Sequence, residues 1–125
     1  MSIARCAPLL LFVLPAAASA QSMNAEIFYQ KAAALAAKGP LALFSGDLKS
    51  VMNEGKAYFA KARATRLAAI KAGQKPRYCP PKNSQGIGSE EYMKSLAAIP
   101  ASERAKIDTT EATTRILTRQ FPCPA

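Results

Sequence analysis

The chain has 125 residues, a length that allows one domain, and its formal net charge is +9. It contains no histidine. This excludes Ser-His and Cys-His nucleophiles, an imidazole general base and a histidine-ligated metal.

Residues 1–20 have the features of a secretory signal peptide, because Arg5 precedes an apolar run over 7–14 and residues 18–20, Ala-Ser-Ala, match a cleavage site. A membrane anchor is the alternative, but spanning a bilayer takes about 20 apolar residues. Cleavage removes one basic residue and no acidic one, so the net charge becomes +8. We expect a mature chain, 21–125, that has no transmembrane segment and is periplasmic or secreted.

Two cysteines remain in the mature chain, Cys79 and Cys123. Two thiols in an exported protein most simply form one disulfide, and free or intermolecular thiols are the alternative. The closed loop of about 45 residues is worth about 4 kcal/mol in the chain-entropy model. Two thiols without histidine are too few for a zinc site, and we expect no cofactor.

The composition of the mature chain favours helices. Alanine is abundant and Val51 is the only valine after residue 20, so the alternation of β-branched residues that is typical of strands is absent. We predict an all-α fold, a small bundle of four to five helices that forms a single domain with one internal disulfide.

The first helix is predicted over 25–38, with Asn24 as its N-cap and Gly39-Pro40 as its stop signal. Its expected apolar face consists of Ile27, Phe28 and Leu35. Residues 41–44 are expected to form a short helical turn.

The longest helix is predicted over 47–72, a rod of about 39 Å. We expect one of its ends to project or to pair with a second copy. Gly55 falls on its apolar face, where we expect it to allow close packing of a neighbouring helix. The residues of this face recur at three- and four-residue steps: Leu48, Val51, Met52, Phe59, Ala62, Ala69 and Ile70.

Prolines and glycines make 74–88 a connector. A third helix is predicted from Ser89, taken as its N-cap, to Pro100. A helical turn within 101–107 and a last helix from Asp108 to Gln120 follow, the latter opened by capping-box spacing. The expected inward residues are Tyr92, Met93, Leu96 and Ile99, then Ala112, Ile116 and Leu117.

Four segments together resemble the Tai-type immunity proteins, which protect bacteria against amidase effectors of type VI secretion. The segments are Tyr78-Cys79-Pro80-Pro81, then 90–96 (Glu-Glu-Tyr-Met-Lys-Ser-Leu), Ile99-Pro100 and Phe121-Pro122-Cys123. The resemblance covers 78–124, under half of the mature chain.

The resemblance implies a small, all-helical periplasmic protein with an internal disulfide. Tai-type proteins bind a peptidoglycan-cleaving amidase, block its cleft, have no catalytic activity of their own and are often dimers. Only Cys79 and Cys123 carry over residue by residue.

Lys49, Lys56 and Arg63 are seven residues apart, and Lys71 lies nearby on the same predicted helix. We call these four residues the basic strip. It is interpreted either as a docking surface for an acidic partner, such as an effector, a cell-wall polymer or an anionic membrane, or as a solvated helix face. Nucleic acid is not expected as a partner in the periplasm. Tyr58 is expected either to fill the core or, if exposed, to anchor a partner or dimer contact.

No enzyme activity is predicted. Glu90 and Glu91 are adjacent and so point in different directions on a helix, unlike a pair of acid–base carboxylates. The threonines of the last helix have no base beside them and are interpreted as caps; they are Thr109, Thr110, Thr113, Thr114 and Thr118. The alternatives to an amidase inhibitor are a structural or stress-associated periplasmic protein and a binder of envelope polymer.

Overall fold

The computed structural model describes residues 22–125, so the predicted signal peptide lies outside the described residues. Within this range the chain is helical, with no strand beyond an isolated bridge between Asn24 and Asp108. The all-α prediction is confirmed. The elements are α1 (Ala25–Ala37), the 3-10 helix η1 (Gly39–Phe44), α2 (Gly46–Lys71), α3 (Ser89–Ala98), α4 (Ala101–Arg104) and α5 (Thr109–Gln120).

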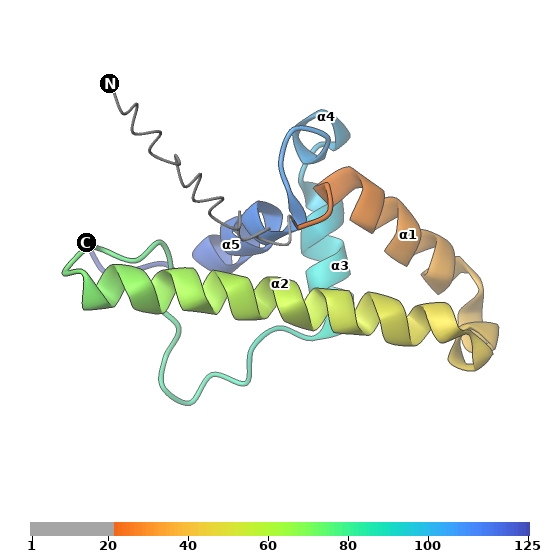
Figure 1. The fold of residues 1–125 in the computed structure, drawn as a ribbon, viewed down its shortest axis with the longest axis horizontal. Helices are drawn as coiled ribbons and strands as arrows, with labels where there is room; N and C mark the ends of the chain where they lie inside the picture. Colours follow the sequence, from red (N-terminus) through yellow and green to blue (C-terminus); the bar gives the residue numbers. More distant parts are fainter. Residues whose placement is uncertain (1–21) are drawn as a thin grey trace, which may run out of the picture.

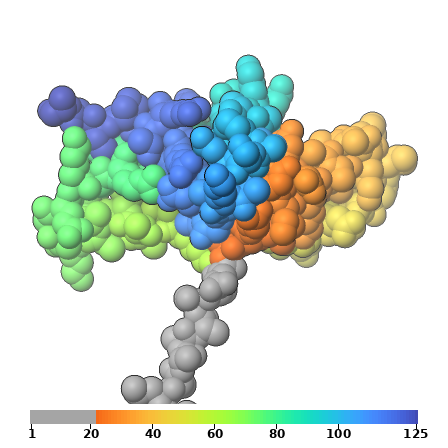
Figure 2. Space-filling view, turned by 90° about the horizontal axis from the view of Figure 1, so that it is seen from above, coloured from red at the N-terminus to blue at the C-terminus, as the bar shows by residue number. Residues whose placement is uncertain are grey.

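Helix α2 runs the whole length of the molecule, and α4 lies on the side away from it (Figure 1). Helix α5 covers one half of α2, whereas α1 and η1 lie against the other half. The connector and the C-terminal segment meet at one end of the molecule, and η1 forms the opposite end (Figure 2). The predicted long helix over 47–72 is therefore confirmed within one residue at each end.

Local sequence signals set most of the helix starts. The Asn24 side chain accepts hydrogen bonds from the first turn of α1, and Asp108 accepts one from the backbone N–H of Glu111 at 2.7 Å. The predicted cap at Ser89 is wrong, because Ser89 is the first residue of α3 and follows the N-cap Gly88. In the sequence Ser89 is the stronger N-cap signal, because the glycine before it has no side-chain oxygen to accept a hydrogen bond.

The core lies where α1, α2, α3 and α5 meet. The predicted inward residues of α3 and α5 are buried or partly buried, as are Phe28 and Leu35 of α1. Three residues predicted to face inward are instead exposed: Ile27 (57%), Met52 (42%) and Ile70 (49%). Ile27 is turned about 100° from the buried Phe28, and Ile70 lies in the last turns of α2. Met52 faces a groove described below.

A buried arginine joins three of the helices. The Arg104 side chain is only 7% exposed, and its Nε lies 2.5 Å from a carboxylate oxygen of Glu26 in α1. Its NH1 group donates to the backbone carbonyls of Leu96, Ala97 and Ile99, which close the end of α3. The guanidinium also stacks over the ring of Tyr29, 4.0 Å from its centroid. Arg104 therefore fixes α1 against the C-terminal end of α3.

The predicted disulfide between Cys79 and Cys123 is confirmed, with an S–S distance of 2.08 Å. The backbone N–H of Cys79 also donates to the carbonyl of Phe121 at 2.8 Å. Beside the bridge, the buried Tyr78 packs with Ala62 of α2 and Leu117 of α5. The bridge and this small cluster together hold the connector and the chain end against the outer half of α2.

We predict that Arg104→Met lowers the free energy of unfolding by about 3 kcal/mol at neutral pH, because the carbonyls at the end of α3 lose the buried donor that they share. The variant also removes the cation that pairs with the partly exposed carboxylate of Glu26. The hydrogen bond from Arg104 holds the pKa of Glu26 below its ordinary value of 4.5. The stabilisation from this lowered pKa is present above about pH 4.5 and is lost as the pH falls through the folded-state pKa. Urea denaturation should therefore show a smaller difference between wild type and variant in acid.

Arg119→Met is the matched control, because this arginine is exposed on α5 and forms no ion pair among residues 22–125. We expect the control to leave the unfolding curve within about 0.5 kcal/mol of wild type. Equal losses for the two variants, or a loss at Arg104 that does not change with pH, would contradict the role assigned to this arginine.

For the disulfide, we predict that the double variant Cys79→Ser, Cys123→Ser loses about 4 kcal/mol of stability and melts about 15 °C or more below wild type. Without the bridge, the loop of about 45 residues is no longer closed in the unfolded state. The unfolded chain then has more conformational entropy, which destabilises the fold. Thermal melts followed by circular dichroism test this, and reduction of the wild-type protein should reproduce the shift. A melting curve unchanged by both treatments would show that the bridge does not stabilise the fold.

Candidate binding groove and basic strip

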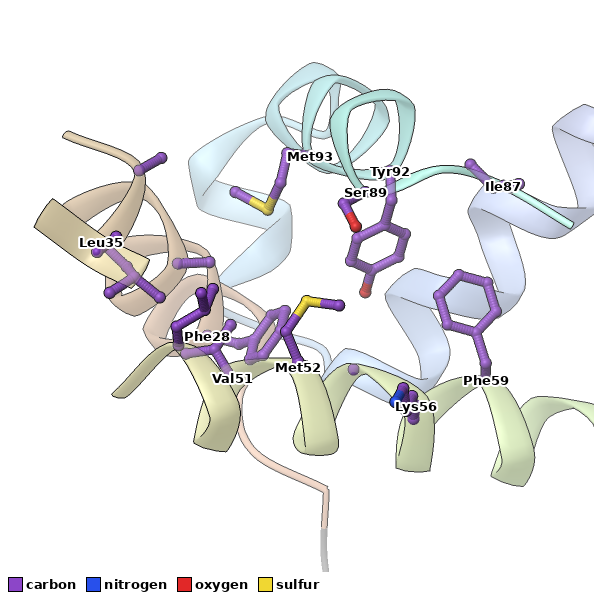
Figure 3. Close-up of a pocket in the computed structure, with 15 residues that line it drawn as sticks. Phe28, Leu35, Val51, Met52, Lys56, Phe59, Ile87, Ser89, Tyr92 and Met93 are labelled. Carbon is purple, nitrogen blue, oxygen red and sulfur yellow. The ribbon is translucent and has the colours of Figure 1, made fainter. Parts of the chain in front are cut away.

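A groove of about 490 Å³ opens between α1, α2 and α3 (Figure 3). The sequence analysis did not predict it. Its walls are mainly apolar side chains from all three helices, among them Phe28, Leu35, Val51, Met52, Phe59 and Met93. We name this feature the α1–α2–α3 groove.

Gly55 contributes to the depth of the groove. A Cβ atom added at this position would meet nothing within 4 Å, so no helix packs closely against it and the predicted close packing is wrong. Gly55 instead lines the groove, midway along α2. An ordinary side chain here would project into the open volume.

Aromatic contacts hold the walls in place. Phe28 packs edge-to-face against Tyr58 and Phe59 packs against Tyr92, both with ring centroids 5.2 Å apart. The Tyr92 hydroxyl is 2.8 Å from Thr113 Oγ1, which links α3 to α5. Burial raises the pKa values of Tyr58 and Tyr92, so both phenols remain neutral at physiological pH.

Tyr58 is not a surface residue. Only 5% of it is exposed, so it fills the core beneath the groove and cannot anchor a partner from the surface. Its neighbour Phe59 lies at the groove itself. Of the two roles considered for Tyr58, core filling is confirmed.

Two polar side chains border the groove. Lys56 projects from α2 on one side and Ser89 from the start of α3 on the other (Figure 3). Lys56 is the only charged residue that lines the groove. A cation beside an apolar groove favours a ligand that carries both apolar surface and negative charge.

The other residues of the basic strip follow the same helix. Lys49 and Arg63 lie one heptad before and after Lys56, so the three share one face of α2, and Lys71 lies at the end of the helix. Lys56 lines the groove, whereas Arg63 and Lys71 lie beyond it. All four residues are exposed, and none forms an ion pair within residues 22–125.

Five of the eight acidic side chains in residues 22–125 pair with cations outside the basic strip. The hydrogen bond that Lys31 donates to Glu54 raises the pKa of Lys31, and the bidentate contact from Arg77 lowers the pKa of Glu111. The charge of the basic strip is therefore left without a counterion from the described chain. The ion pairs are Glu26–Arg104, Asp47–Lys38, Glu54–Lys31, Glu103–Arg115, Glu111–Arg77 and Glu111–Arg115.

The side chains considered for catalysis have structural surroundings. Glu90 and Glu91 are exposed in the first turn of α3. The threonines are not helix caps: Thr113, Thr114 and Thr118 donate to the carbonyls four residues earlier, and Thr109 donates to the carbonyl of Met23. No group of histidine, cysteine, aspartate or glutamate residues within 22–125 could hold a metal ion.

The tip of the molecule carries a second apolar feature that the sequence analysis missed. The predicted turn is confirmed as η1, but its large side chains are directed to solvent: Leu41 is 72% exposed, Leu43 74% and Phe44 88%. The sequence signal for this exposed apolar feature is the presence of three large apolar residues in a segment too short to bury all of them. Only Ala42 of this segment is buried.

A scan against protein-family models, a search of curated proteins and a search of solved structures each found no match for this chain. The similarity to Tai-type immunity proteins therefore stays a prediction from the sequence. Among residues 22–125, no helix has the length and apolar character needed to cross a membrane.

Proposed function

We propose that this protein is an exported, non-catalytic binding protein that docks an acidic partner on its basic strip. The observation that carries the proposal is that no acid of residues 22–125 forms an ion pair with the basic strip, so Lys49, Lys56 and Arg63 remain exposed and unpaired along α2. A row of cations attracts an acidic surface and accelerates association.

The partner class proposed is a peptidoglycan amidase delivered by type VI secretion. Its support is the resemblance of residues 78–124 to Tai-type immunity proteins. The disulfide Cys79–Cys123 supports export, because such bonds persist in oxidising compartments. The periplasm, where such an amidase acts, is the compartment we propose.

A rigid surface suits inhibition by docking. The strip lies on one continuous 26-residue helix, so its side chains keep a fixed spacing of about 10 Å per heptad. Exposed cations of this kind act mainly on the rate of association and on partner choice. An anionic envelope polymer is the second candidate, because a row of exposed cations also suits a repeating anion.

The test is an inhibition assay with a type VI amidase effector, taken from a neighbouring gene if one encodes an exported amidase. We predict that the wild-type protein stops peptidoglycan digestion, and that Lys49→Glu, Lys56→Glu, Arg63→Glu together weaken inhibition roughly a hundredfold. Raising the salt from about 0.05 to about 0.5 M should weaken the wild-type interaction as well.

The matched control reverses the same amount of charge away from the strip, with Lys82→Glu, Lys94→Glu and Lys106→Glu at exposed positions. Undiminished digestion at saturating wild-type protein would reject the amidase as partner, and equal losses in both triple variants would reject the strip as docking surface. Binding to purified cell wall that depends on the strip, without any effect on the amidase, would favour the envelope polymer.

A further inference from the structure

The α1–α2–α3 groove has the dimensions of a ligand site. Its volume of about 490 Å³ falls within the usual range of small-molecule pockets, about 300–1,000 Å³. From Lys56 to Leu48 along α2 it measures about 12 Å at 1.5 Å per residue, and its lining continues onto Leu35 and Ala36 of α1 and Ala42 of η1. An elongated apolar groove of this length suits a chain-like ligand better than a compact one.

The two methionines can adapt the walls to such a chain. Met52 of α2 and Met93 of α3 both line the groove, and their side chains extend into the space between the two helices (Figure 3). Methionine is unbranched and flexible, so it can follow the surface of an alkyl chain. The walls beyond Met52, at Phe28, Val51 and Leu35, are apolar.

The polar groups mark where the head of the ligand lies. Lys56 brings a positive charge without a counterion in the described chain, and the Ser89 hydroxyl faces the groove from the other side. The Tyr92 hydroxyl is already bonded to Thr113 and does not compete. We infer that the groove binds a long-chain fatty acid, with its carboxylate at Lys56 and Ser89 and its alkyl chain directed toward Leu35.

The charge of the rim argues against a second copy of this chain as the occupant. The basic strip meets the groove at Lys56, so a symmetric contact there would bring like charges together. A fatty acid instead brings one carboxylate to Lys56, which has no ion pair within residues 22–125. This inference does not depend on the amidase, since it concerns the groove and shares only Lys56 with the proposed docking surface.

The test uses protein purified from cells that express the full chain and then delipidated. This protein is titrated calorimetrically with palmitate below the micelle concentration of palmitate. We expect saturable binding of one palmitate per chain. Laurate, four methylenes shorter, should bind roughly a hundredfold more weakly, given the usual contribution of a buried methylene. The neutral analogue 1-hexadecanol should bind roughly tenfold more weakly than palmitate because it lacks the charge.

Two variants locate the site. Gly55→Leu places a side chain in the groove where an added Cβ meets nothing within 4 Å, and it also improves helix propensity, so the fold should persist while palmitate binding is lost. Lys56→Gln should reduce palmitate affinity to that of hexadecanol. Lys106→Gln is the control, an exposed lysine outside the groove lining and the basic strip, and should bind as wild type does.

Several results would overturn the inference. These are the absence of saturable palmitate binding by the wild type, unchanged binding by a folded Gly55→Leu variant, and equal affinity of the wild type for palmitate and hexadecanol. A dimer that Gly55→Leu dissociates, in a protein that does not bind palmitate, would assign the groove to a second copy. If the protein binds palmitate but does not inhibit an amidase, the proposed function is rejected and the fatty-acid site is retained.

Discussion

The buried guanidinium of Arg104 is the interaction on which the geometry of the groove depends. It binds Glu26 of α1 and the last carbonyls of α3, and these two helices form two of the three walls. A charge that is 7% exposed is stable only when its donors are satisfied, so the position of Arg104 allows little freedom to either helix. The ring of Tyr29 covers the guanidinium from α1. The groove is therefore an opening between fixed walls rather than a gap between loosely packed helices.

The placement of the acids determines which cations face solvent without a partner. The structural ion pairs use Glu26, Glu54 and Glu111 to hold α1, α2 and α5 to their neighbours. The cations of the basic strip on α2 receive no acid from the described chain. The same set of ion pairs thus stabilises the fold and leaves Lys56 unpaired beside the apolar α1–α2–α3 groove. Such a surface is suited to binding a partner or ligand that supplies the missing negative charge.

Much of the fold could be predicted from the sequence because its signals are local. Asn24, Gly39-Pro40 and Asp108 mark helix ends through their own backbone preferences, and two cysteines in an exported chain leave one simple pairing. The groove could not be predicted, because it depends on the angles between helices.

The burial of some individual side chains also could not be predicted from the sequence. Tyr58 and Phe59 are adjacent on α2 and equally suited to a core, so only the packed structure shows that the tyrosine lies deeper. Arg104 gave no signal, because its partner Glu26 is 78 residues away and an arginine is ordinarily expected at the surface. The basic strip was predicted from heptad spacing, and its exposure is confirmed.

The central claim is that α1, α2 and α3 form a preformed groove that holds a ligand, beside the basic strip proposed to dock a partner. The most direct measurement is the spectrum of methionine methyl groups labelled with carbon-13, since residues 22–125 contain only Met23, Met52 and Met93. On titration with palmitate, the resonances of Met52 and Met93 should shift together and saturate, whereas that of Met23, which does not line the groove, should stay in place. A titration in which Met52 and Met93 do not move, or in which all three methyl groups shift alike, would contradict the account.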